Sequence, residues 1–267
     1  FFTSIHNSGC QAAESPLVYR DNTYTIDFDD LERKAADPAV KLMLLCNPHN
    51  PAGRVWTPAE LHRIGELCLR HDVVVVADEI HCELVMPGFR YTPFASLCEE
   101  FERRSVTCTS PSKAFNLAGL QVANIFAADA ALRARIGHSL QINETGEIGP
   151  FAIEALIAAY DEGAEWLDAL NEYLHGNYRF SREYFDRNLP QYPVLPLEGT
   201  YLVWVDCRAS GLTSDELETK LLEEAKLRIN PGAIYGEAGR DFIRLNIACP
   251  RKLLAEGLDR LRKVLKR

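Results

Sequence analysis

Residues 41–78 have the sequence KLMLLCNPHNPAGRVWTPAELHRIGELCLRHDVVVVAD, and this stretch decides the fold. The apolar run at residues 41–46 stops at an Asn-Pro pair, and because the position before a proline disfavours helix, we predict a buried strand. Residues 57–60 form a capping box with proline at the first helical position, and apolar side chains follow at helical spacing. Residues 73–77 are apolar without polar alternation, as in a strand covered on both faces of a parallel sheet. Strand, helix and strand together form a βαβ unit.

The alternation of strands and helices continues beyond this unit. The pattern predicts further elements, in chain order a strand at residues 105–109, an apolar segment at 122–127, and helices at 130–141, 150–160 and 165–188. It then predicts strands at 201–205 and 242–247 and helices at 214–225 and 250–266. We therefore predict an α/β fold, with a mostly parallel sheet carrying helices on both faces in a large domain, plus a smaller C-terminal α+β domain. The large domain comprises residues 1–164 and the small domain residues 165–267, with the long helix bridging them.

Composition and charge argue against several classes of protein. The chain has 267 residues, of which 47% are hydrophobic, and its net charge of −9 argues against a nucleic-acid binder. The eight cysteines form no C-x-x-C pair, and several lie in apolar stretches, which predicts reduced, buried thiols of a cytoplasmic protein. Cysteines and histidines lack metal-site spacing, so we expect no metal. The apolar runs are too short to cross a membrane, and the start without Met leads us to expect further residues upstream.

Polar side chains follow three of the predicted strands, where ligands of open α/β sheets bind. Asn50 lies in a turn made rigid by two prolines and a glycine, and the alternative is a purely structural turn. Asp78 is either a helix N-cap or a carboxylate that meets a positive group in a dry site. Lys113 lies in an otherwise uncharged stretch. Most lysines are solvated, but a desolvated lysine loses its proton more readily, which Schiff-base chemistry requires.

Four short motifs occur in order along the chain. They are N-P-H-N-P-A-G at residues 47–53, D-E-I-H at 78–81, S-P-S-K at 110–113 and I-R-L-N at 243–246. In this order they resemble the fold-type-I pyridoxal-phosphate enzymes, the aspartate aminotransferase superfamily. The resemblance covers the whole chain and implies a PLP-dependent transferase-like fold. It also implies a longer protein, because the family's N-terminal arm and glycine-containing phosphate loop have no counterpart among these residues.

The resemblance implies a role for each matching residue. Lys113 matches the lysine that binds pyridoxal 5'-phosphate through its amine and later moves the substrate's Cα proton. Asp78 matches the aspartate that pairs with the pyridine nitrogen, and Asn50 matches the amide that hydrogen-bonds the ring hydroxyl and borders the substrate. His81 stands where aminotransferases usually have a tyrosine with the same partner. Arg244 matches the arginine that binds the substrate α-carboxylate, and the alternative for this residue is a salt bridge in the core.

The residues that would hold the cofactor phosphate match the family less completely. Ser110 matches the serine that binds the phosphate, with Ser112 assisting, although serines at such a junction often cap backbone groups instead. Many aminotransferases have a phosphate-binding arginine at the position of Gln121, and that charge is absent here.

Several departures from the aminotransferases favour a different reaction. His81, the missing arginine at Gln121 and the sequences at residues 46–56 and 229–232 resemble the C-S lyase branch, the MalY/PatB type, which is similar to cystathionine β-lyase. This resemblance implies release of pyruvate, ammonia and a thiol from cystathionine or a related L-cysteine S-conjugate. An aminotransferase that uses a 2-oxo acid and a non-catalytic regulator remain as alternatives. The family resemblance further implies a homodimer with its site at the interface and a small amino-acid substrate.

Overall fold

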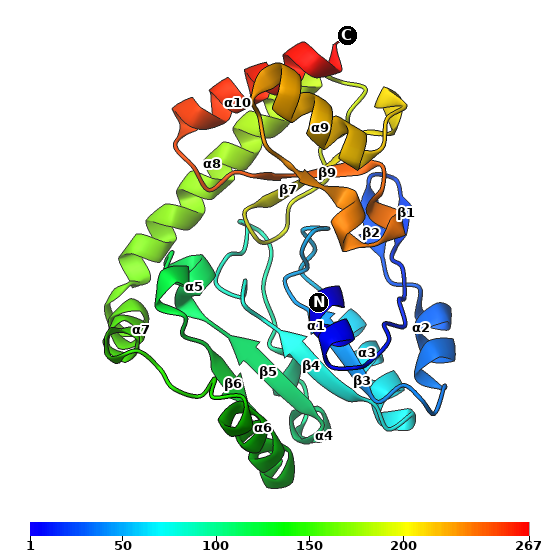
Figure 1. Ribbon diagram of the computed structural model, residues 1–267, viewed down its shortest axis with the longest axis vertical. Helices are drawn as coiled ribbons and strands as arrows, with labels where there is room; N and C mark the ends of the chain where they lie inside the picture. Colours follow the sequence, from blue (N-terminus) through cyan, green and yellow to red (C-terminus); the bar gives the residue numbers. More distant parts are fainter. Residues whose placement is uncertain (267) are drawn as a thin grey trace.

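The predicted βαβ unit belongs to a four-stranded sheet in the computed structural model, which describes residues 1–266 (Figure 1). The strands lie in the order β3-β4-β5-β6 and have the bounds Leu42–Cys46, Val74–Asp78, Ser105–Thr109 and Asn124–Phe126. The first three strands are parallel, and β6 is antiparallel to β5. The apolar segment predicted at residues 122–127 therefore contains the antiparallel member of a mostly parallel sheet.

Helix α3 (Pro58–Arg70) connects the first two of these strands and begins at the predicted capping box. The Thr57 hydroxyl accepts a hydrogen bond from the Glu60 backbone N–H at 3.2 Å, and the Glu60 carboxylate accepts one from the Thr57 N–H at 2.8 Å. This reciprocal pair satisfies two of the N–H groups that a helix leaves without partners at its N-terminus. The local sequence alone therefore fixes where α3 begins.

One face of the sheet packs against a core shared with several helices. The elements of this core besides β3, β4 and α3 are α2 (Phe28–Ala35), α4 (Glu99–Arg103) and the short helix η1 (Phe94–Ser96). Burial alternates along β4, because Val75 and Ala77 are buried whereas Val74 and Val76 are partly exposed. The α/β fold is thus confirmed, but within the described residues β4 is fully packed on one face only. An apolar run predicts a strand without showing how completely each face is covered.

A series of helices follows the sheet and leads away from it. They are α5 (Pro111–Ala114), η2 (Ala118–Leu120), α6 (Ala130–Ile142), α7 (Pro150–Glu162) and α8 (Ala164–Asn188). Figure 1 shows α8 as a long diagonal helix running from α7 to the second group of strands. The start of α8 lies where we predict the boundary between two domains, and that boundary remains a prediction. Residue 267, the last residue of the predicted small domain, lies outside the described residues.

The second sheet is antiparallel, with strand order β7-β9-β8. Its strands are β7 (Leu202–Asp206), β9 (Phe242–Asn246) and β8 (Asn230–Pro231), and its helices are α9 (Ser214–Ala225) and α10 (Arg251–Leu265). Buried side chains of this sheet, of α9 and α10 and of the second half of α8 form the largest core cluster. The four predicted elements of the α+β unit are present within two residues of their expected bounds, whereas the short strand β8 was not predicted.

The first 25 residues contain elements that the sequence pattern did not predict. They are α1 (Phe2–Asn7), β1 (Val18–Arg20) and β2 (Thr23–Thr25), and the two strands form an antiparallel hairpin. Asp21 and Asn22 at its turn both have positive φ, of 51° and 60°, which is typical of a type I′ turn. The hairpin packs on the second sheet through Tyr24, which lies in one core cluster with Trp204 and Phe242. Strands of three residues are too short to show a period.

The cysteines differ from our prediction in their exposure. All eight are free thiols, but only Cys68 and Cys207 are buried, whereas Cys10 is exposed and the others are partly buried. Alternate side chains of a strand point to opposite faces, so a cysteine in an apolar run need not face the core. In the described part of the chain no helix is long and apolar enough to span a bilayer. Residues 1–266 also contain no cluster of three metal-binding side chains.

Candidate active site

The turn after β3 is held by side chains of its own sequence motif. Asn47 is buried, donates to the Thr92 carbonyl at 3.0 Å and accepts from the Trp56 N–H at 3.4 Å. His49 Nδ1 accepts from the Ala52 N–H at 3.4 Å, and its ring lies edge-on to Trp56 at 5.5 Å. Burial, together with the charge of the nearby Arg54, lowers the pKa of His49 to about 4. His49 is therefore a neutral structural residue that helps to rigidify the turn carrying Asn50.

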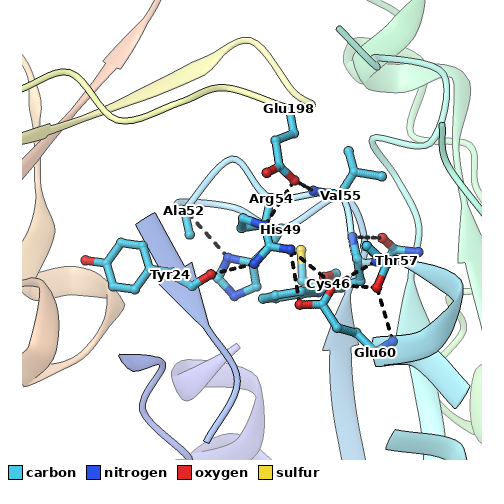
Figure 2. A network of polar contacts seen from close by, with 11 residues as sticks. Tyr24, Cys46, His49, Ala52, Arg54, Val55, Thr57, Glu60 and Glu198 are labelled. Carbon is cyan, nitrogen blue, oxygen red and sulfur yellow. Dashed lines mark hydrogen bonds and ion pairs between the residues drawn. The ribbon is translucent and has the colours of Figure 1, made fainter. Parts of the chain in front are cut away.

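Arg54 is the centre of a polar network that the sequence did not reveal (Figure 2). Its Nε donates to Glu198 Oε2 at 3.0 Å and its Nη2 to both carboxylate oxygens of Glu60 at 3.1 Å, while Nη1 donates to the Tyr24 carbonyl. Glu198 Oε2 also accepts from the Val55 N–H at 2.8 Å. The guanidinium thus joins the hairpin, the start of α3 and the loop before β7. This arrangement braces the turn that presents Asn50.

Asp78 occupies the carboxyl end of β4. Its Oδ1 accepts from the Ile80 N–H at 3.2 Å, and no cation lies within ion-pair distance of it in the described residues. Burial raises the pKa of Asp78, and the charge of Lys113 acts in the opposite direction. A desolvated carboxylate at a strand end, with little compensation from the protein, is suited to accept a proton-bearing ligand group.

His81 lies one turn beyond Asp78 and is almost fully buried, with 4% of its surface exposed. Its Nδ1 has no hydrogen-bond partner, and its ring packs edge-on against Tyr201 at 5.7 Å. Burial lowers the pKa of His81 to about 4, and the charges of Lys113 and Arg244 add to this effect. The imidazole is therefore neutral near pH 7 and keeps one ring nitrogen available for a ligand.

Lys113 lies in the first turn of α5, directly after β5. Among the described residues, its Nζ makes no hydrogen bond or ion pair. Ser110 caps this helix: its hydroxyl accepts from the Ser112 N–H at 3.1 Å and donates to the Val122 carbonyl at 2.6 Å. The capping role that we gave as the alternative for Ser110 is therefore present. The single proton of the Ser110 hydroxyl is already donated to the Val122 carbonyl. Gln121 is exposed and has a φ of +53°.

Arg244 in β9 reaches the turn after β3. Its Nη1 donates to Asn50 Oδ1 at 3.0 Å and its Nη2 to Asn230 Oδ1 at 2.9 Å, while its Nε is buried without a partner. The Tyr235 ring lies against the guanidinium, 5.1 Å from ring centroid to Cζ. No ion pair of Arg244 occurs within residues 1–266, so the alternative of a core salt bridge is wrong. Its two amide partners carry no charge.

These side chains come from distant parts of the sequence and share one site. A direct hydrogen bond joins Asn50 to Arg244, and the charges of Lys113 and Arg244 both act on His81. The charge of Lys113 acts on Asp78 in turn. The site therefore lies between the carboxyl ends of the parallel strands and the antiparallel sheet, as expected for an open α/β sheet.

The chemistry of these groups fits pyridoxal phosphate. The unpaired amine of Lys113 suits the cofactor's aldehyde, and the desolvated carboxylate of Asp78 suits its ring nitrogen. The unpartnered imidazole nitrogen of His81 suits its ring oxygen. The amide nitrogen of Asn50 is free to donate because its oxygen is the atom bound to Arg244. Within residues 1–266 the Ser112 hydroxyl makes no hydrogen bond, whereas the Ser110 hydroxyl is already hydrogen-bonded within the protein.

Fold and site together define the class of pyridoxal-phosphate enzymes with the aminotransferase fold. Comparison with known proteins then identifies the family: the model for aminotransferase class I and II matches residues 4–261. The chain belongs to this family.

Two curated relatives and one solved structure are particularly similar to the chain. Cystathionine beta-lyase PatB of Bacillus subtilis (strain 168) is 43% identical over 265 residues, covering 99% of this chain and 68% of that protein. Protein MalY of Escherichia coli (strain K12) is 37% identical, covering 97% of this chain and 66% of that protein. The structure of cystalysin from Treponema denticola, which contains a pyridoxal 5'-phosphate cofactor, has a TM-score of 0.97 at 36% identity. The match covers 100% of this chain and 68% of that chain. The chain thus spans about two thirds of the length of these relatives.

Proposed function

We propose that this protein is a pyridoxal-phosphate-dependent carbon-sulfur β-lyase that acts on cystathionine or a related L-cysteine S-conjugate. The observation that carries the proposal is the meeting of Asn50, Asp78, His81, Lys113 and Arg244 in one site. The identity of 43% to a protein named cystathionine beta-lyase supports the same reaction. The products would be pyruvate, ammonia and a thiol.

Asp78, His81 and Asn50 would hold the cofactor ring. The bound cofactor supplies an electron sink for the negative charge left when a bond at the substrate Cα is broken. Asp78, at the end of β4, would pair with the ring nitrogen and keep it protonated, which its desolvated position favours. His81 and the Asn50 amide would donate to the ring oxygen, so neutral His81 would carry its proton on the nitrogen that faces the ring.

Lys113 would act as the base that moves the substrate's Cα proton. Its amine would hold the cofactor, and with the substrate amine in that place Nζ would be free beside the substrate to accept a proton. Lys113 Nζ takes the Cα proton, and the electron pair left on Cα expels the β-sulfur as a thiolate, so that the C–S bond breaks without a separate oxidant. Hydrolysis of the remaining three-carbon fragment gives pyruvate and ammonia.

Arg244 would bind the substrate α-carboxylate. A planar guanidinium is suited to bidentate binding of a carboxylate, and this guanidinium is partly buried without a protein counter-charge among the described residues. Asn50 would border both ligands, because its oxygen accepts from Arg244 and its amide nitrogen would be left to donate to the cofactor.

The remaining parts of the assignment concern the phosphate and the assembly. The Ser112 hydroxyl would contact the cofactor phosphate, while Ser110, whose proton is donated to the Val122 carbonyl, would hold the N-terminus of α5 in place. We further propose a cytoplasmic homodimer with the active site at its interface. The free thiols support the cytoplasmic location. The exposed apolar side chains of α7, which are Phe151, Ile153 and Ile157, support an interface with a second copy.

An aminotransferase is the second candidate, because the matching family model is that of aminotransferase class I and II. Both reactions share removal of the Cα proton and differ in the step that follows, so a few kcal/mol of transition-state stabilisation decides between them. A non-catalytic regulator would have no need for an unpaired lysine, a buried aspartate and a buried arginine in one site.

The deciding experiment measures pyruvate and free thiol released from L-cystathionine by the full-length protein, with pyridoxal phosphate and without a 2-oxo acid. Sustained turnover is the result expected for a β-lyase. Release that stops after about one equivalent and resumes as amino transfer when a 2-oxo acid is added would assign an aminotransferase instead. The K113A variant serves as the control, since it should lose both turnover and the lysine-dependent visible absorbance of the cofactor.

A further inference from the structure

Asn230 has a position that neither the cofactor nor the substrate explains directly. It lies in β8, and its backbone is the cross-strand partner of Arg244 in β9. Its Oδ1 accepts from Arg244 Nη2 at 2.9 Å, which is the usual distance of a well-formed N–H···O hydrogen bond. The antiparallel register therefore places an amide oxygen against the guanidinium.

Three neighbours restrict the orientation of the Arg244 guanidinium. Asn50 holds Nη1 at 3.0 Å, Asn230 holds Nη2 at 2.9 Å, and Tyr235 lies against one face at 5.1 Å. A guanidinium has five N–H donors, of which these amides engage two, so donors remain for a ligand. One of the remaining donors, on Nε, is buried and unpartnered.

The chemistry of the acceptors has a consequence for ligand binding. A carboxylate at either position would form an internal ion pair and neutralise the guanidinium, whereas an amide oxygen fixes its orientation and leaves its charge intact. A buried charge without a counter-ion favours binding of an anion. We propose that Asn230 is a positioning residue that orients Arg244 for the substrate α-carboxylate while preserving its charge. This inference rests on the proposed function of Arg244.

Binding without turnover tests this inference directly. Holoenzyme is titrated with L-alanine, which has no β leaving group, and with ethylamine, which has the same amine but no carboxylate, and the cofactor's visible absorbance is followed. The ratio of the two affinities measures recognition of the carboxylate. In N230D this ratio should fall by about tenfold or more, and in N230A by about threefold, because alanine removes the hydrogen bond but adds no charge. KM for L-cystathionine should rise in both variants while kcat changes less than twofold.

A matched control separates this role from a general effect of charge or stability. Asn188 in α8 also accepts from an arginine, Arg262, at 3.4 Å, and its amide nitrogen donates to the Tyr184 carbonyl. Because neither of these bonds involves Arg244, N188D should leave the affinity ratio unchanged. An equal loss of affinity for both ligands in the Asn230 variants, or an unchanged ratio, would overturn the inference. If N230D does not fold, N230A decides.

The proposed function fails by a different result. Wild-type holoenzyme that does not prefer L-alanine over ethylamine would contradict the assignment of Arg244 to the α-carboxylate. A wild-type preference that persists undiminished in N230A would contradict only the positioning role of Asn230.

Discussion

Replacing Arg54 with alanine should destabilise the protein more than removal of any surface ion pair. The side chains of Arg54, Glu60 and Glu198 are only 12%, 20% and 14% exposed, so the variant leaves two poorly solvated carboxylates without their counter-charge. Breaking a buried ion pair by removing one partner typically costs 3–5 kcal/mol. Because these carboxylates keep some access to water, we expect the lower end of this range, a loss of about 3 kcal/mol in the free energy of unfolding.

Urea unfolding followed by tryptophan fluorescence measures this loss, since Trp56 lies next to the network and is 2% exposed. R103A is the matched control: Arg103 and its partner Glu99 are each 69% exposed, and their pair should contribute less than about 0.5 kcal/mol. E198Q should lower the free energy of unfolding less in the R54A background than in the wild type, because in R54A it removes a carboxylate charge that has already lost its partner. A loss in R54A no larger than in R103A would refute the network's role.

Three further predictions concern other buried positions. Burial lowers the pKa of His81 to about 4, so below its ordinary value of about 6.5 the unfolded chain binds a proton that the folded chain does not, and stability falls as pH falls through this window. Between pH 6.5 and 5 the wild type should lose about 1.6 kcal/mol more than H81Q, and an equal pH dependence in urea unfolding would contradict this. G232A places a Cβ against the Gly239 carbonyl and should cost about 3 kcal/mol or more, whereas G119A, with no atom within 4 Å of its Cβ, should leave the urea midpoint nearly unchanged. Asn177 is fully buried and donates to two backbone carbonyls at 2.7 and 2.9 Å, so N177L should lose about 2 kcal/mol; an unchanged Tm would argue against it.

The sequence predicts the parts of the fold that local patterns encode. The capping box fixes the start of α3, and the apolar runs before Asn47 and Asp78 locate two neighbouring parallel strands. Because polar residues at the carboxyl ends of such strands converge, the spacing also places Asp78 and Lys113 in one site. These features depend on residues close together in the chain, so a single sequence is sufficient to find them.

The features that the sequence did not predict depend on distant partners. Arg54 contacts Glu198, 144 positions away, and nothing in the local sequence distinguishes this arginine from a solvated one. The hairpin is held by tertiary packing of Tyr24 on Trp204, which the local sequence does not show. Its turn could have been predicted, because Asp21 and Asn22, which have positive φ in the structure, are residue types that favour such turns. In the sequence, Asn230 stood out only as part of the stretch at residues 229–232. That Arg244 is its partner follows from the register of β8 and β9.

Helix α8 mechanically links the two halves of the site. Its N-terminal turn stacks Trp166 on Phe115, two residues after Lys113, and the rest of the helix carries Leu174 and Phe185 into the core cluster shared with β7 and β9. With 25 residues, α8 is about 37 Å long. A tilt of about 5° at one end would move the other by about 3 Å, which is a full hydrogen-bond length. The stiffness of α8 therefore contributes, together with the direct hydrogen bond from Arg244 to Asn50, to how accurately Arg244 is positioned relative to Lys113.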